Sequence, residues 1–123
     1  MAKILLVEDL PDNAELARRA LTSAGHEFFH APDAESGLQM AQSLQPELIL
    51  LDLGLPDYDG QTLAGWLRAD PLTAAIPIVA FSAWPEETAR AMAASYGCEG
   101  FIAKPIVKVG DFLAQISAFL KTN

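Results

Sequence analysis

The stretch "ELILLDLGLPD" (residues 47–57) joins a strongly apolar run to a charged residue. Four consecutive apolar residues, 48–51, are typical of a strand in a parallel sheet that is buried on both faces. Asp52 follows them directly, and a turn containing glycine and proline comes next (54–56). A carboxylate at the tip of such a strand is held rigidly while its oxygens face solvent. This arrangement indicates a chemical role for Asp52.

Apolar runs of this kind alternate along the chain with segments of helical period. The predicted strands cover residues 3–8, 26–31, 47–52, 76–82 and 100–103. The predicted helices cover residues 12–25, 33–45, 60–70, 85–97 and 109–121. This alternation indicates an α/β domain whose parallel sheet is covered by helices on both faces. We expect a flavodoxin-like, doubly wound (βα)5 fold with strand order 2-1-3-4-5, formed as a single domain by residues 1–123.

Length and composition restrict the class of protein. The 123 residues suit one domain, and 51% hydrophobic with 20% charged residues is typical of a globular chain. The apolar runs are too short to span a membrane or to form the core of a signal peptide. Cys98 is the single cysteine, so an internal disulfide is excluded and a cytoplasmic location is expected. The net charge of −8 argues against direct nucleic-acid binding, because the chain would repel phosphate groups.

Polar side chains stand at the carboxyl ends of four predicted strands. They are Glu8 and Asp9 at the first, Asp52 at the third, Ser82 at the fourth and Lys104 after the fifth. Open parallel sheets bind ligands beyond this edge, at the point where the strand order reverses. In the expected order the first and third strands are neighbours. The three carboxylates should therefore lie within a few ångströms of one another.

Three carboxylates this close cannot all stay ionised unaided, because each raises the pKa of the others. Mg²⁺ prefers oxygen ligands and takes few protein carboxylates, so we expect it as the cofactor. Lys104 adds a positive charge and Ser82 a hydroxyl. Such a pocket suits phosphoryl transfer, in which charge on the phosphoryl oxygens is neutralised. Asp52 could itself be the nucleophile and form an aspartyl-phosphate, with the main-chain carbonyl of Gly54 turned toward the metal.

The segments that carry these residues resemble the receiver domain of two-component response regulators. They are VEDLPDN (7–13), LILLDLGLPDYDG (48–60), IPIVAFSA (76–83) and GFIAKPI (100–106). The resemblance extends over the whole chain and is strongest to stand-alone members, similar to the chemotaxis regulator and to single-domain phosphorelay proteins. It implies a phosphoacceptor that is loaded from a phosphohistidine of a histidine kinase or histidine phosphotransferase. Output would be a conformational signal to a protein partner or onward phosphotransfer, without an output domain in the same chain.

The resemblance implies a role for each residue of the acidic pocket. Asp52 would accept the phosphoryl group and also contact Mg²⁺. Asp9 would bind the metal directly, Glu8 directly or through a water, and the Gly54 carbonyl would complete the protein ligands. Autocatalysed phosphorylation and dephosphorylation would be the only reactions, so the chain is expected to be a switch and not an enzyme in the usual sense.

The resemblance also implies the parts of a switch. Lys104 would pair with Asp52 before transfer and with a phosphoryl oxygen afterwards, and the Lys104–Pro105 peptide bond would be cis. Ser82 would hydrogen-bond another phosphoryl oxygen and pull the following loop inward. Phe101 stands at the position of the family's switch aromatic, which is often tyrosine, and it lacks the hydroxyl.

Partner contacts are expected at two places. The kinase would meet the first helix and the loop after the fifth strand, around Leu10, Ala14, Ala17 and Ile106. Trp84, on the loop after the fourth strand, would cover the pocket or contact a partner. The expected oligomeric state is a monomer or a weak homodimer, without a membrane partner.

Several other polar residues are predicted to have no role in the site. His26 and His30 flank an edge strand and are expected to be exposed. Asp57 and Asp59 are expected to belong to a polar loop.

Three alternatives stay open. An aspartyl-nucleophile phosphatase would use the same pocket but needs a second acid two residues after the nucleophile, where this chain has Gly54. A flavodoxin-type carrier needs a phosphate-binding loop after the first strand, where this chain is acidic. The sequence is also compatible with a receiver fragment of a larger hybrid kinase.

Overall fold

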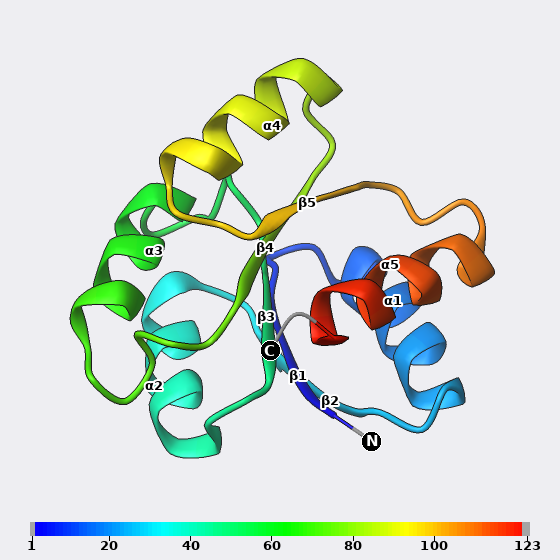
Figure 1. Cartoon of the computed structure of the whole chain (residues 1–123), viewed down its shortest axis with the longest axis horizontal. Helices are drawn as coiled ribbons and strands as arrows, with labels where there is room; N and C mark the ends of the chain where they lie inside the picture. The colour runs from blue at the N-terminus through cyan, green and yellow to red at the C-terminus, as the bar shows by residue number, and fades with distance from the viewer. Residues whose placement is uncertain (1, 122–123) are drawn as a thin grey trace.

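A parallel sheet in the order β2-β1-β3-β4-β5 forms the centre of the computed structural model, which describes residues 2–121 (Figure 1). The strands are β1 (Lys3–Val7), β2 (Glu27–Ala31), β3 (Leu48–Leu51), β4 (Ile78–Ser82) and β5 (Gly100–Ala103). The helices are α1 (Pro11–Ser23), α2 (Ala34–Leu44), α3 (Gly60–Ala69), α4 (Glu86–Ser95) and α5 (Val109–Lys121). The predicted flavodoxin-like fold and strand order are confirmed, with element boundaries shifted by at most two residues.

The register of the sheet aligns the carboxyl ends of its strands. Val7 in β1 lies opposite Leu51 in β3 and opposite Ala31 in β2. At the other side of the sheet, Ser82 in β4 lies opposite Ala103 in β5. The residues that follow these pairs therefore emerge along one edge of the sheet.

Helices cover both faces of the sheet, with α1 and α5 on one side and α2 and α3 on the other (Figure 1). Successive strand residues point to opposite faces. Ile4 and Leu6 accordingly pack in the core beneath α1 and α5, whereas Leu5 and Val7 pack beneath α2 and α3. The apolar strand residues thus fill two cores, and the central strands are held rigidly between them. No helix within residues 2–121 has the length and apolar character that crossing a membrane requires.

The start of α1 differs from the prediction. The helix begins at Pro11, one residue before the predicted start, and Leu10 occupies the capping position without a side-chain hydrogen bond. Proline suits the first helical position, because the N–H that it lacks would have no partner within the helix there. The turn leaving β1 is therefore short, and it keeps Glu8 and Asp9 close to the helix.

Small residues of α1 pack against the sheet. Ala14, Ala17 and Ala20 are buried, together with Leu21. The prediction that Ala14 and Ala17 contribute to a partner surface is therefore wrong, because their methyl groups face the core. Alanine at these positions lets the helix backbone lie close to β1 and β2.

A close main-chain contact explains the glycine at the start of α3. A Cβ atom at Gly60 would lie 2.9 Å from Leu53 Cα and 3.2 Å from the main-chain oxygen of Asp52. Neither atom can move without displacing the end of β3. At Gly65, in the same helix, a Cβ would meet no atom within 4 Å.

We expect Gly60→Ala to lower the free energy of unfolding by about 1–3 kcal/mol, because the added methyl group overpacks against main-chain atoms. The matched control Gly65→Ala should raise it by about 0.5–1 kcal/mol, because alanine is the better helix former. Urea denaturation followed by circular dichroism measures both. Equal effects of the two substitutions would contradict the close contact.

Candidate functional site

Main-chain hydrogen bonds continue the sheet one residue beyond three strands and fix the residues of the site. The Asp52 N–H donates to the carbonyl of Val7 over 2.9 Å, and the Lys104 N–H donates to that of Ser82 over 2.9 Å. The Glu8 N–H donates to the carbonyl of the last residue of β2 over 2.9 Å. The side chains therefore leave the sheet from immobile backbone atoms.

The predicted acidic residues come together. Glu8, Asp9 and Asp52 each offer one carboxylate oxygen, and these oxygens lie within 4.8 Å of one another. Glu8 is 0% exposed and Asp52 is 7% exposed, whereas Asp9 is more open to solvent. Lys104 Nζ lies 2.8 Å from Glu8 Oε1 and 3.4 Å from Asp52 Oδ1. One ammonium group therefore contacts two of the three clustered carboxylates, and its shorter contact is with Glu8 and not with Asp52, the expected partner.

This charge imbalance separates the pKa values of the two buried acids. Burial, followed by the hydrogen bond to Glu8, raises the pKa of Asp52 to about 7. Burial also opposes ionisation of Glu8, but hydrogen bonds to Asp52 and Lys104 outweigh it and bring the pKa of Glu8 below its usual value. The closer approach of Lys104 to Glu8 explains which acid keeps its charge. Asp52 therefore keeps its proton to a higher pH than Glu8 does.

The donor set fits Mg²⁺. It consists of carboxylate oxygens alone, which hard divalent cations prefer. The excess negative charge would be offset by a bound cation, which would also favour release of the proton from Asp52. Gly54 borders the site, because its N–H donates to Asp52 Oδ1 over 3.1 Å.

The other predicted residues surround this cluster. Ser82 is buried, and its Oγ accepts a hydrogen bond from the Trp84 N–H over 3.0 Å. Phe101 in β5 is half-buried, with its ring centroid 5.4 Å from the Arg90 guanidinium carbon. The Lys104–Pro105 peptide bond is cis, as the resemblance implies.

His30 contacts the site although no role for it was predicted. It is half-buried and not exposed, and its Nε2 lies 2.6 Å from the main-chain oxygen of Glu8. A carbonyl only accepts hydrogen bonds, so Nε2 carries the hydrogen. In the sheet His30 of β2 pairs with Leu6 of β1, close to Glu8 in the sequence. This pairing of the two strands is the feature that could have predicted the contact of His30 with the site. His26 is likewise half-buried, and its Nδ1 accepts from the Ala2 N–H over 3.2 Å.

Asp57 is a second residue whose place the sequence did not reveal. Its carboxylate accepts hydrogen bonds from the N–H groups of Ala34 (2.9 Å) and Glu35 (3.1 Å), at the start of α2. Asp59 lies in the same loop and accepts from the Thr62 N–H over 2.8 Å at the start of α3. The loop after Asp52 is thus attached to two helices and is not merely a polar connection.

The family model for the response regulator receiver domain matches residues 4–117. The chain belongs to this family. Receiver domains are switch proteins of two-component signalling, and they bind Mg²⁺ at an acidic pocket, in keeping with the cluster around Asp52.

Individual relatives support the assignment. The DNA-binding dual master transcriptional regulator RpaA of Synechocystis is 35% identical over 121 residues, covering 98% of this chain and 50% of RpaA, so the receiver domain spans about half of that relative. The polar-differentiation response regulator DivK of Brucella anthropi is 31% identical, over 95% of this chain and 94% of DivK.

Solved structures agree with the fold. A response regulator from Desulfuromonas acetoxidans superimposes with a TM-score of 0.87 at 27% identity, covering 99% of this chain and 98% of its own. The Vibrio cholerae chemotaxis protein CheY4 has the same fold, with a TM-score of 0.88 at 23% identity, over 97% of this chain and 98% of CheY4.

The raised pKa of Asp52 predicts a pH-dependent stability. The folded state holds the Asp52 proton more tightly than the unfolded state does, so protonation of Asp52 contributes to the free energy of unfolding. This contribution is fully present below the ordinary pKa of 3.8 and is lost as the pH rises to about 7. With a chelator present, Asp52→Asn should therefore be more stable than wild type near pH 8, by on the order of 1–2 kcal/mol after allowance for solvent screening.

Urea unfolding between about pH 4 and pH 8 measures this difference, which should shrink toward acid pH. Asp12→Asn, which replaces an exposed acid of α1, is the matched control and should follow wild type. A wild type at least as stable as Asp52→Asn near pH 8 would show that the acids do not repel each other.

Proposed function

We propose that this chain is a single-domain phosphoacceptor switch in which Asp52 takes a phosphoryl group from a phosphohistidine. The donor would be a histidine kinase or a histidine phosphotransferase. The observation that carries the proposal is the position of the Asp52 carboxylate, fixed at the tip of a central strand beside Glu8 and 3.4 Å from the ammonium of Lys104.

The transfer requires the ionised form of Asp52. A carboxylate oxygen of Asp52 attacks the phosphorus, the bond from phosphorus to the histidine nitrogen breaks, and the imidazole leaves with the electron pair. The Gly54 N–H donates to Asp52 Oδ1 over 3.1 Å and so restrains the orientation of the carboxylate. Lys104, 3.4 Å from the same oxygen, lies within reach of a phosphoryl oxygen after transfer.

The acidic residues prepare the same pocket for a cation. Glu8, Asp9 and Asp52, with the main-chain carbonyl of Gly54, would hold Mg²⁺. The bound ion supplies positive charge that neutralises the phosphoryl oxygens. Lys104 Nζ, 2.8 Å from Glu8 Oε1, adds a second positive charge beside these acids.

Ser82 connects the phosphoryl group to the loop that precedes α4. A hydroxyl donates one hydrogen and accepts on its lone pairs, so Ser82 can donate to a phosphoryl oxygen and still accept from the Trp84 N–H. Movement of Ser82 toward Asp52 would therefore draw the Trp84 main chain with it. Phe101 would follow by rotating on β5, which gives a surface change that a partner can read.

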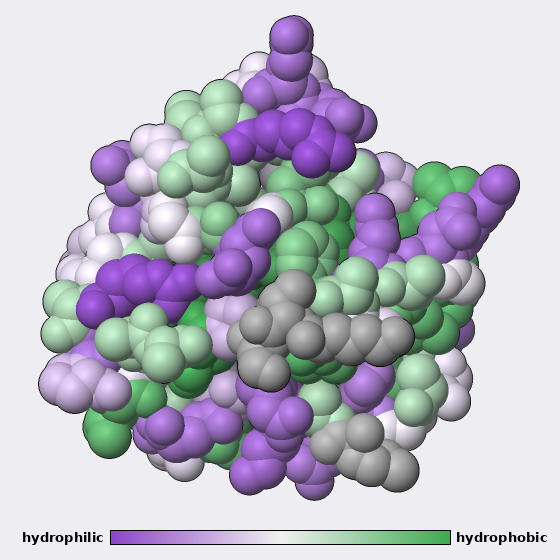
Figure 2. Space-filling view, viewed as in Figure 1, coloured by the Kyte–Doolittle hydropathy of each residue, from purple (hydrophilic) through white to green (hydrophobic). Residues whose placement is uncertain are grey.

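We assign the kinase contact to the exposed residues around the carboxyl edge of the sheet. Leu10 is 53% exposed and Val107 82% exposed, and Figure 2 shows hydrophobic atoms at the loop between β5 and α5. Ile106 is only half-buried and Trp84 is exposed, so both remain candidates for contact. Ala14 and Ala17 do not belong to this surface, because they face the core.

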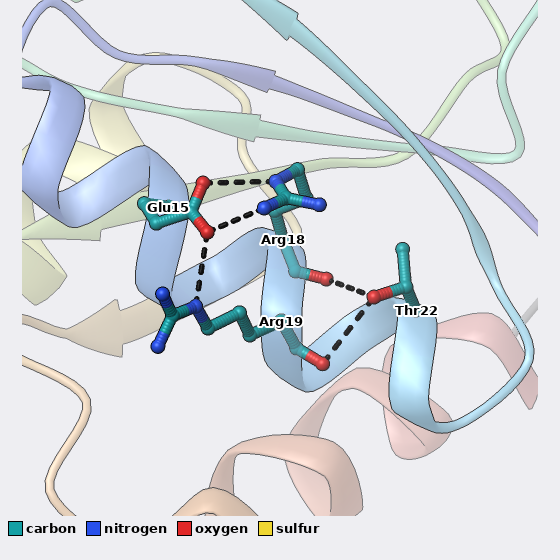
Figure 3. Close-up of polar contacts among 4 residues, drawn as sticks. All are labelled: Glu15, Arg18, Arg19 and Thr22. Carbon is teal, nitrogen blue, oxygen red and sulfur yellow. Dashed lines mark hydrogen bonds and ion pairs between the residues drawn. The ribbon is translucent and has the colours of Figure 1, made fainter.

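The outward face of α1 carries a charged cluster beside this surface. Glu15 accepts hydrogen bonds from both Arg18 and Arg19, and the Thr22 hydroxyl donates to the Arg18 carbonyl over 2.7 Å (Figure 3). Such exposed pairs contribute only a few tenths of a kcal/mol to helix stability. They do keep the two guanidinium groups in defined positions on an otherwise acidic protein, which suits recognition of an acidic partner surface.

The central test of the proposal is labelling with a small phosphodonor. Incubation with acetyl phosphate and Mg²⁺ should add the mass of one phosphoryl group to the intact protein. Labelling should disappear in Asp52→Asn and with a chelator, because each removes an essential part of the pocket. Asp12→Asn, the matched control, should label as wild type does. Full labelling of Asp52→Asn would overturn the assignment of the acceptor.

The switch can be tested separately from the transfer. We expect Ser82→Ala to label on Asp52 but to lose most of the change in tryptophan fluorescence that labelling produces in wild type, because Trp84 is no longer coupled to the phosphoryl group. A Trp66→Phe background leaves Trp84 as the single tryptophan. Ser95→Ala on α4 is the control. An unchanged fluorescence response in Ser82→Ala would exclude the proposed coupling.

A further inference from the structure

The carboxylate of Asp57 joins two segments that lie far apart in the sequence. Its Oδ1 accepts hydrogen bonds from the N–H groups of Ala34 and Tyr58, over 2.9 and 3.0 Å. Its Oδ2 accepts from the Glu35 N–H over 3.1 Å. One side chain therefore ties the loop after β3 to the first turn of α2.

The start of α2 has a cap of its own, so it does not need Asp57 for that purpose. Asp33 occupies the N-cap position and accepts from the Ser36 N–H over 2.8 Å, the pattern typical of a complete cap. Asp57 binds the N–H groups of the first two helical residues, which the Asp33 side chain does not reach. What the Asp57 contact adds is a fixed position for the loop.

That loop is folded back on itself next to the phosphoacceptor. The main chains of Gly54 and Asp59 pair in an antiparallel bridge. The Tyr58 ring packs edge-on against Trp66 of α3, with 4.8 Å between ring centroids. At its other end the Gly54 N–H holds Asp52 Oδ1 over 3.1 Å. A displacement of the loop would therefore be transmitted to the carboxylate that accepts the phosphoryl group.

We propose that Asp57 is a positioning residue for the phosphoacceptor site. Its hydrogen bonds anchor the loop to α2 and so hold the Gly54 main chain against Asp52. The Gly54 N–H and the Gly54 carbonyl, a proposed metal ligand, thereby keep their positions relative to the acidic side chains. This inference rests on the proposed function, since it concerns how that site is held and not what it does.

The neighbouring Asp59 provides a matched comparison. It lies in the same loop, is exposed as Asp57 is, and accepts hydrogen bonds at the start of a helix, from the N–H and the hydroxyl of Thr62 over 2.8 Å each. Its contact is local, because α3 follows it directly in the sequence. Loss of the Asp59 carboxylate should weaken the start of α3 without releasing the loop from α2.

The test measures the rate of acetyl phosphate labelling by intact mass as Mg²⁺ is varied, for wild type, Asp57→Ala, Asp57→Asn and Asp59→Asn. We expect Asp57→Ala to raise the Mg²⁺ concentration for half-maximal labelling about 10-fold, the lower end of the effects seen for groups that support metal ligands. Asp57→Asn, which keeps one acceptor oxygen, should give a smaller shift. Asp59→Asn should stay within about twofold of wild type, and urea unfolding should show that all variants are folded.

The outcomes separate this inference from the function on which it rests. If wild type labels and Asp57→Ala shows the same Mg²⁺ dependence, the positioning role is wrong and the phosphoacceptor assignment stands. If Asp59→Asn shifts the Mg²⁺ dependence as much as Asp57→Ala does, the effect is one of helix capping in general, which also overturns the role of Asp57. If wild type does not label at all, the proposed function fails, and the inference fails with it.

Discussion

The parallel pairing of β1 with β3 is the constraint on which the site depends. The hydrogen bond from the Asp52 N–H to the Val7 carbonyl fixes the first residue after β3 beside the end of β1. Glu8 and Asp9 follow Val7 directly, so the pairing of the two strands keeps them close to Asp52. Burial of both strands between two apolar cores holds this arrangement in place despite the repulsion that it creates.

At this edge of the sheet, the favourable packing of the apolar strands thus opposes the electrostatic repulsion among the acids. Lys104 offsets part of the repulsion, and the proton retained by Asp52 offsets another part. A receiver domain needs a site whose negative charge is only partly neutralised, since a pocket already neutralised by its own side chains would have little affinity for a cation or a phosphoryl group. The stability lost at this edge is small beside that gained from the buried apolar residues of the sheet.

Most of the fold and the centre of the site could be predicted from the sequence. Continuous apolar runs marked the buried strands, and the topology rule for parallel sheets then brought Glu8, Asp9, Asp52, Ser82 and Lys104 to one edge. The contacts of His30 and Asp57 could not be predicted, because they join a side chain to a main-chain group of a distant segment and leave no pattern along the chain. Ala14 and Ala17 were misplaced because only the resemblance put them on a partner surface, whereas the structure buries both.

The strands that carry the site residues differ in how many neighbouring strands hold them in the sheet. Asp52 and the two acids after β1 leave from strands that have a neighbour on each side. Lys104 instead follows β5, a four-residue strand at the edge of the sheet, which within residues 2–121 pairs with β4 alone. Edge strands open locally at lower free energy than central ones. Fraying of β5 would withdraw the ammonium while the carboxylates remain, so hydrogen exchange at this border would report on the electrostatic state of the pocket.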